Sequence, residues 1–256
     1  MNNDFKELYE LFMNVKRKGW IRSKRKGPTG VGYTFEESIN KPEENFPIPD
    51  FKSIEIKATR KSSMGRVHLF SATPDGDFLF PIDRIIEKLG YPDKKYPNYK
   101  VFCMNFNGKF FSKIGIFKKG KINVNYNDRK VDFIAFKNSG RNLNVDTSWS
   151  FDMLEEKLNL KLKYLAIIRA RTKKVNGIEY FLYDEIKFYK LKDFNTFLKL
   201  IEDGCIGVSF NISIFKDELH LGKRHDRGCG FFINNYYLNK LYDEVSMDYC
   251  LGHEVA

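Results

Sequence analysis

The stretch PDFKSIEIKATR (residues 49–60) decides the fold and the chemistry of this 256-residue chain. From Ser53 onward polar and apolar residues alternate strictly, which is the period of a β-strand that has one polar and one apolar face. The pattern predicts that Ile54 and Ile56 lie on one face, with Glu55 and Lys57 on the other. Asp50 precedes this strand at a Pro-Asp turn, so two carboxylates and a lysine gather in one short segment.

These three residue types suit phosphodiester hydrolysis. Carboxylates hold Mg²⁺ against the scissile phosphate, where the metal activates water and offsets charge on the leaving oxygen. Asp50 and Glu55 are the candidate ligands. Lys57, on the face of Glu55, is placed to orient or help deprotonate the attacking water and to stabilise developing charge. The alternative is an ordinary charged strand face, because D-x4-E-x-K also arises by chance.

The charge balance favours a polyanionic partner. The chain carries 44 Lys and Arg against 33 Asp and Glu, a net charge of +11, and such an excess attracts nucleic acid. Lysines that only solvate the surface are the alternative. With 42% hydrophobic and 16% aromatic residues, the composition excludes a disordered tail or linker.

Cysteine usage and the N-terminus predict the compartment. No two cysteines form a CxxC pair, which argues against a disulfide framework or a zinc ribbon and favours reduced thiols. The N-terminus MNNDFKELYELF has no basic region followed by an apolar one, and no apolar run reaches the length of a membrane span. We therefore expect a cytoplasmic bacterial protein without a membrane partner. The four cysteines are Cys103, Cys205, Cys229 and Cys250.

Helical and strand patterns alternate along the chain, which predicts an α+β (mixed α/β) fold with a mixed central sheet flanked by helices. Asn-Gly at 107–108 and Lys-Gly at 119–120 indicate turns. Helices are expected at 4–18, 150–159 and 194–202, and strands at 67–72, 101–106, 110–117, 121–126, 131–136, 163–172, 179–190 and 206–215.

A basic stretch with several glycines, residues 16–32, is predicted to be a loop. Lys24, Arg25 and Lys26 within it are candidate phosphate contacts, the alternative being a solvated charge run. Its GPTGVG segment lacks the Gly-Lys-Ser/Thr ending of a nucleotide-binding loop. After it, Thr34 and Glu37 form an expected capping box for a short helix, which leaves Glu36 unused by the cap.

Several collinear segments resemble one nuclease family over nearly the whole chain. They are similar to the PD-(D/E)XK nuclease core and, within it, to the MvaI/BcnI-type restriction endonucleases, which are related to the MutH mismatch-repair nickase. The segments are GW at 19–20, KRKGPTGVGYTFEE at 24–37, PDFKSIEIKATR at 49–60, LF at 69–70, WSFDMLEEKLNLKLKYLAII at 149–168, IEDGCI at 201–206 and GKRHDRG at 222–228.

The resemblance implies a site and an architecture. Glu36 corresponds to the helix-borne acid, Asp50 and Glu55 to the metal-binding carboxylates, and Lys57 to the catalytic lysine. It further implies a catalytic lobe of approximately residues 1–150 and a DNA-recognition lobe mainly from approximately 160–235. The implied enzyme is a type II restriction endonuclease, a monomer that uses Mg²⁺, with Mn²⁺ as a substitute, to nick each strand of double-stranded DNA in turn at a short pseudosymmetric site. A cognate DNA methyltransferase encoded nearby is the implied companion.

DNA contacts are expected from the later segments. The resemblance implies that His225, in GKRHDRG, touches DNA; His68, beside the catalytic strands, is a second candidate. Where family members carry charged base-reading residues, this chain has Ser209 and Asn211, and it has Phe232 in place of an arginine. The Asn211 amide matches an adenine edge, and Arg227 suits guanine or phosphate.

Competing site interpretations are weaker. His220, His225 and Cys229 suggest zinc, but the spacing matches no common site and a fourth ligand is missing. An HNH-type centre at His225-Asp226 would need further ligands, and the sequence offers little besides His253.

Two other functions stay open: a MutH-like repair enzyme that nicks one strand, and a DNA-binding protein that no longer cuts. The intact set of Asp50, Glu55 and Lys57 argues against the latter, because a pure binder has no need of three such charges together.

Overall fold

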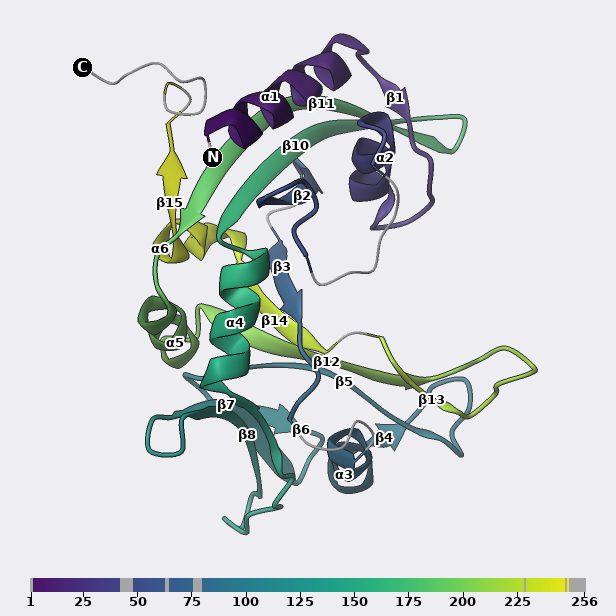
Figure 1. Ribbon diagram of the computed structural model, residues 1–256. Coiled ribbons are helices and arrows are strands. Elements are labelled where there is room, and N and C mark those ends of the chain that lie inside the picture. The colour runs from purple at the N-terminus through teal and green to yellow at the C-terminus, as the bar shows by residue number, and fades with distance from the viewer. Residues whose placement is uncertain are drawn as a thin grey trace. The chain divides into compact units, whose positions relative to one another are not determined.

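The computed structural model describes residues 2–41, 48–62, 65–75, 80–227, 229–246 and 248 (Figure 1). The chain forms two compact units. Unit 1 comprises Met1–Gly65, Lys157–Lys192 and Asn239–Ala256, and unit 2 comprises Arg66–Glu156 and Asp193–Leu238. Cys250 and His253 lie outside the described residues.

Unit 1 is built on a mixed sheet, which within the described residues has five strands in the order β1-β11-β10-β2, with β15 also paired to β11. Strands β2 and β10 run parallel, with Glu55 opposite Leu165 and Lys57 opposite Ile167, whereas the other pairs are antiparallel. The mixed α and β fold class is therefore confirmed. The strands are β1 (Ile21–Arg22), β2 (Ile54–Arg60), β10 (Tyr164–Val175), β11 (Ile178–Leu191) and β15 (Tyr242–Val245).

Two helices bury one face of this sheet, α1 (Asn2–Arg17) and α2 (Gly30–Ser38). Figure 1 shows α1 lying along β10 and β11. Helical spacing places Phe5, Leu8 and Phe12 in the core, and each such buried side chain stabilises the fold by roughly 1.5–3 kcal/mol. Ile54 and Ile56 join the same core. Glu55 and Lys57 consequently lie on the opposite face of β2, as the alternation predicts.

Among its described residues, unit 2 contains two sheets. One has the order β3-β14-β12-β5-β4 with β13 also paired to β12, and the other has the order β6-β7-β8-β9; all of their pairs are antiparallel. The strands are β3 (Arg66–Ser71), β4 (Tyr91–Pro92), β5 (Lys100–Asn107), β6 (Ser112–Ile114), β7 (Lys118–Asn125), β8 (Lys130–Lys137), β9 (Thr147–Ser150), β12 (Ile206–Ile214), β13 (Arg224–Asp226) and β14 (Gly230–Asn234). Helices α3 (Phe80–Leu89) and α5 (Phe194–Glu202) and the short η1 (Asn235–Tyr237) complete the unit.

Aromatic rings join the two sheets of unit 2. Phe133 of β8 packs against Phe106 of β5 and Phe210 of β12, with ring centroids 4.6 and 4.8 Å apart. Trp149 is fully buried among them, and its indole N–H donates to the Ala72 carbonyl at 3.0 Å. The high aromatic content of the chain therefore fills a core.

Helices α4 (Phe151–Lys161) and α6 (Leu238–Leu241) each begin in unit 2 and end in unit 1. Residues 157–192 belong to unit 1 because β10 pairs with β2 and β11 pairs with β10. The two lobes expected from the sequence were instead consecutive stretches of the chain, divided after about residue 150. Which unit recognises DNA stays a proposal. Among the described residues, no helix has the length and apolar character needed to cross a bilayer.

Several local predictions were wrong. Lys119 and Gly120 lie within β7, paired with Phe136 and Ala135, and form no turn. Helix α3 and strands β9 and β13 were not predicted; the two strands have only four and three residues. The turn at Asn107 is confirmed: its side-chain oxygen accepts bonds from the backbone N–H groups of Lys109 and Phe110.

Candidate active site

A tight turn brings Asp50 to strand β2. Phe51 and Ile54 exchange two backbone hydrogen bonds of 2.9 and 2.7 Å, which folds the chain back on itself. The Asp50 Oδ2 atom then accepts the backbone N–H of Ile56 at 3.1 Å. Ile56 stands between Glu55 and Lys57, so this bond fixes the first carboxylate beside the other two side chains. The D-x4-E-x-K spacing thus has a structural cause.

Glu55 is the most buried charged group of the site, with 1% of its side chain exposed. Its Oε1 atom accepts a hydrogen bond from Lys57 and lies 3.6 Å from Nζ of Lys161 at the end of α4. Burial raises the pKa of the Glu55 carboxyl and Asp50 adds to the rise, while Lys57 and Lys161 oppose it. Its Oε2 atom is buried without a hydrogen-bond partner among the described residues.

The donor set of Asp50 and Glu55 fits a hard divalent cation. A buried carboxylate oxygen without a partner is costly unless something satisfies it, and carboxylate oxygens are the ligands that Mg²⁺ prefers. The other Asp50 oxygen, Oδ1, is 3.1 Å from Nζ of Lys41. In the described part of the chain, no three Asp, Glu, His or Cys side chains group closely enough to hold one metal. Two carboxylates with water suffice for many Mg²⁺ sites.

Glu36 lies half-buried on α2, and the capping box expected in front of it at Thr34 and Glu37 does not form. Helix α2 begins at Gly30, so Thr34 sits inside the helix, and its hydroxyl accepts the backbone N–H of Lys24 at 3.0 Å. The capping-box prediction was therefore wrong. Glu37, its supposed partner, is exposed, with a carboxylate oxygen 3.8 Å from Nζ of Lys24. The choice of Glu36 over Glu37 rests on the family resemblance.

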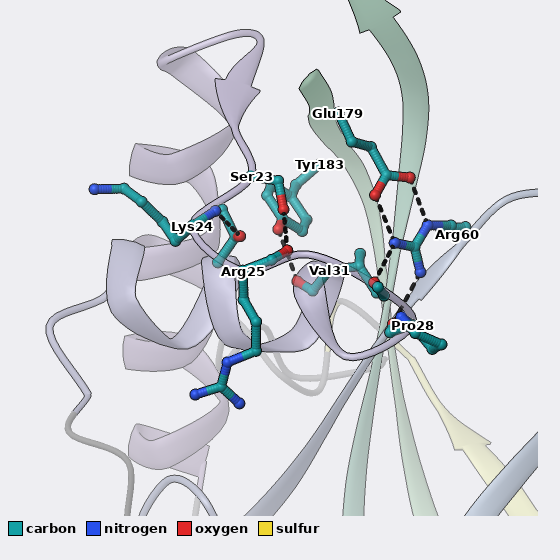
Figure 2. A network of polar contacts seen from close by, with 10 residues as sticks. Ser23, Lys24, Arg25, Pro28, Val31, Arg60, Glu179 and Tyr183 are labelled. Atoms are coloured by element: carbon teal, nitrogen blue, oxygen red, sulfur yellow. Dashed lines mark hydrogen bonds and ion pairs between the residues drawn. The ribbon is translucent and has the colours of Figure 1, made fainter. Parts of the chain in front are cut away.

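The basic loop, defined as residues 22–28, leads into α2. Lys26 is exposed, and about half of the Lys24 side chain is. The Arg25 guanidinium lies 3.8 Å from the ring centroid of Tyr33, a cation–π contact that fixes its direction. Figure 2 shows Lys24 and Arg25 extending outward from the loop. The structure thus brings the three predicted phosphate contacts together on one loop of unit 1.

The predicted contacts of unit 2 lie on neighbouring strands. His225 on β13 is opposite Ser213 of β12, and the Arg227 N–H donates to the Asn211 carbonyl at 3.0 Å. The His225 ring stacks on Phe215, with centroids 4.1 Å apart and planes within 5°. Its Nδ1 is buried without a partner among the described residues. Asn211, His225 and Arg227 therefore form one group.

The other unit 2 residues singled out from the sequence have local partners. His68 is exposed on β3, with Nε2 3.2 Å from the Ser71 hydroxyl. Ser209 donates to the Asn105 side-chain oxygen at 2.6 Å, and Phe232 packs beneath the Arg66 guanidinium at 4.3 Å. Each of these contacts lies within unit 2.

The zinc alternative finds no support in the described residues. His220 bonds to Asp217 through Nδ1 at 2.7 Å, while Cys229 Sγ contacts Asp226 Oδ1 at 3.3 Å. These side chains are occupied by separate partners.

Lys161 was missed by sequence reasoning. It lies within the segment 149–168 that carries the family resemblance, but nothing in its spacing marks it as a neighbour of Glu55. The parallel pairing of β10 with β2 brings the residues just before β10 close to those at the start of β2. Only the register between β10 and β2 would have identified Lys161 as a neighbour of Glu55.

A mixed sheet with two carboxylates and a lysine at the start of a strand paired in parallel is the arrangement expected of a PD-(D/E)XK nuclease. The model of the MvaI/BcnI restriction endonuclease family matches residues 9–242. The chain belongs to this family, and it is a type II restriction endonuclease, a site-specific deoxyribonuclease.

Two solved structures are similar over nearly the whole chain. The complex of restriction endonuclease MvaI with its cognate DNA substrate has a TM-score of 0.87 and 28% identity, covering 96% of this chain and 98% of that one. MvaI in the absence of DNA has a TM-score of 0.61 and 27% identity, covering 95% and 96%. A search among curated proteins gave no significant match.

Proposed function

We propose that this chain is a Mg²⁺-dependent enzyme that cuts double-stranded DNA as a monomer, nicking each strand in turn at a short pseudosymmetric site. The observation that carries the metal dependence is the buried Glu55 carboxylate, whose Oε2 has no protein partner among the described residues. Asp50 and Glu55 would hold the ion, with Mn²⁺ as a substitute. The bound ion supplies an activated water and charge neutralisation at the scissile phosphate.

The residues around this pair have distinct roles in the proposal. Lys57 would orient the attacking water and stabilise charge on the phosphate, since it lies on the face of β2 that carries Glu55. Lys161 would help to keep Glu55 ionised. Glu36, from α2, would add a further acidic group near the reacting phosphate. The products would carry 5′-phosphate and 3′-hydroxyl ends.

DNA binding is proposed for both units. Lys24, Arg25 and Lys26 would contact backbone phosphates, which give affinity without sequence information. His68, Asn211, His225 and Arg227 would face the duplex from unit 2, with the Asn211 amide suited to adenine. The solved MvaI complex contains cognate DNA, which supports the same partner for this chain. A cognate DNA methyltransferase encoded nearby would protect the host.

Incubation of the purified protein with unmethylated phage DNA and supercoiled plasmid tests this function. With Mg²⁺ or Mn²⁺, discrete phage fragments are expected, and a transient nicked circle should precede linear plasmid. Nicked circles as the end product would instead favour a MutH-like nickase. No cutting with any divalent metal would overturn both.

Matched variants test the metal ligands. Asp50→Asn and Glu55→Gln should abolish cutting, because each removes a charged ligand with little change in shape. Glu185→Gln on strand β11 of the same sheet is the control, since that acid is partly exposed and pairs with Lys61. Equal cutting by wild type, Asp50→Asn and Glu55→Gln would contradict the assigned ligands.

A further inference from the structure

Arg60, the last residue of β2, makes four hydrogen bonds around its guanidinium group (Figure 2). Nε and Nη2 donate to the two carboxylate oxygens of Glu179 at 2.8 and 2.7 Å. Nη1 donates to the Pro28 carbonyl at 2.9 Å and Nη2 to the Gly27 carbonyl at 3.0 Å. One side chain thereby ties β2, β11 and the end of the basic loop together.

The pair with Glu179 leaves Arg60 little capacity to bind anything else. Planar, bidentate Arg–carboxylate pairs are among the stronger ionic contacts. Only about a fifth of each side chain is exposed, and the hydrogen bonds from Arg60 hold the pKa of Glu179 below its ordinary value. Arg60 also packs 5.3 Å from the Phe181 ring centroid. Its charge is therefore neutralised within the protein.

The backbone of the basic loop is closely constrained. Gly27 adopts a φ of +88°, which other residues rarely accept, and the loop approaches α2 so closely that a Cβ on Gly30 would collide with the Arg25 carbonyl. Its first half is held by Ser23 N–H donating to the Glu179 carbonyl at 2.8 Å. The last two residues are held by Arg60.

The loop forms one wall of an open pocket of about 660 Å³ in unit 1. The end of the β10–β11 hairpin, including Lys174 and Gly177, also lines this pocket. Arg22, Lys24, Arg25 and Lys26 line the loop side. The Arg60–Glu179 pair lies between these two elements and adds no net charge, so the pocket owes its positive character to the surrounding side chains.

We propose that Arg60, fixed by Glu179, is a positioning residue that holds the basic loop in the shape that binds backbone phosphates of DNA. The proposal rests on the proposed function, since it assigns a DNA-binding role to Lys24, Arg25 and Lys26. Arg60 itself does not touch DNA. It acts through the Gly27 and Pro28 carbonyls, which fix where the three basic side chains begin.

The double variant Arg60→Gln/Glu179→Gln separates position from charge, because it removes one charge of each sign. Its affinity for a labelled random-sequence duplex is measured across a salt titration. Positioning predicts affinity roughly tenfold weaker and a slope of log K against log salt reduced by about 2, because several phosphate contacts fail together; one lost contact changes it by about 0.9. Wild-type affinity would overturn the proposal. Arg171→Gln/Asp184→Asn, which removes another ion pair between β10 and β11, is the control.

Glu179→Gln distinguishes positioning from direct contact. If Arg60 bound phosphate itself, freeing it from Glu179 would tighten DNA binding; positioning predicts weaker binding. Arg60→Lys keeps the charge but loses the planar fork, so its affinity should resemble that of Arg60→Gln. Tighter DNA binding by Glu179→Gln, or wild-type DNA affinity in Arg60→Lys, would overturn the proposal.

Limited trypsin digestion gives a readout without DNA. Cleavage after Lys24, Arg25 and Lys26 should accelerate in the Arg60/Glu179 double variant and not in the control, with thermal melting confirming that both are folded. Unchanged cleavage would contradict the positioning role. If wild-type protein bound no DNA while digestion changed as expected, the proposed function would fail and the loop-holding role would stand.

Discussion

Lys161, at the end of α4, lies with its Nζ 3.6 Å from Oε1 of Glu55, the same oxygen to which Lys57 donates a hydrogen bond. Two lysines thus share one oxygen of a buried carboxylate, while the other oxygen has no partner among the described residues. Burial raises the pKa of Glu55 and the lysines lower it. The two lysines favour the ionised carboxylate against the effect of burial and leave one oxygen available to a cation.

Replacing Lys161 with Met should make cleavage more sensitive to acid. Loss of its charge raises the pKa of Glu55 further, so more of the carboxyl is protonated at a given acidic pH and fewer molecules bind metal. The acid limb of log kcat/KM against pH is expected to move to higher pH. Lys163→Met, at an exposed position two residues away, is the control. An acid limb at the wild-type position would show that Lys161 has no electrostatic role.

Lys57→Ala should stop cutting with little effect on binding. The lysine bonds to Glu55 on β2, and removing a group proposed to stabilise transition-state charge should cost about a hundredfold or more in rate. Single-turnover cleavage and DNA affinity, measured on the same preparation, separate the two effects. Lys61→Ala is the control, because that lysine pairs with Asp184 and Glu185. A parallel loss of affinity would make Lys57 a DNA anchor instead.

Strand β2 was predictable because its signals are local. Alternation over a few residues determines which face of a strand each side chain takes, and the structure confirms buried Ile54 and Ile56 opposite Glu55 and Lys57. Local patterns also predicted most of the longer strands and helices. The extreme burial of Glu55, by contrast, depends on what packs against that face.

The failures involve partners that local sequence patterns do not specify. Thr34 is a residue type that often caps helices, but here the helix begins earlier, at Gly30. The Thr34 hydroxyl therefore accepts a hydrogen bond from the backbone N–H of Lys24 in the preceding loop. Lys161 reaches Glu55 through the parallel pairing of β2 and β10, which a single sequence does not specify. Arg60 on β2 forms its ion pair with Glu179 on β11 of the same sheet. Each of these contacts depends on tertiary pairing.

Asn211→Ala and Lys26→Ala should affect DNA binding in different ways. An amide that reads an adenine edge gives about 1–3 kcal/mol of discrimination, so Asn211→Ala should relax specificity at one base pair. Lys26→Ala should weaken binding to every sequence equally and reduce the salt slope by about 0.9. Affinities for a set of duplexes that differ at single positions measure both. Uniform weakening by Asn211→Ala would exclude base readout.

The Arg60–Glu179 pair should stabilise the fold only where Glu179 is ionised. Its folded pKa is lowered below the ordinary value of 4.5, so the contribution, about 1 kcal/mol, is present above 4.5 and is lost as pH falls through the folded pKa. The difference in unfolding free energy between wild type and Glu179→Gln should therefore be largest near neutral pH and shrink in acid, which urea unfolding across this range measures. A difference that stayed constant would assign the effect to packing. In that case the fork geometry at Gly27 and Pro28, rather than charge, would hold the loop.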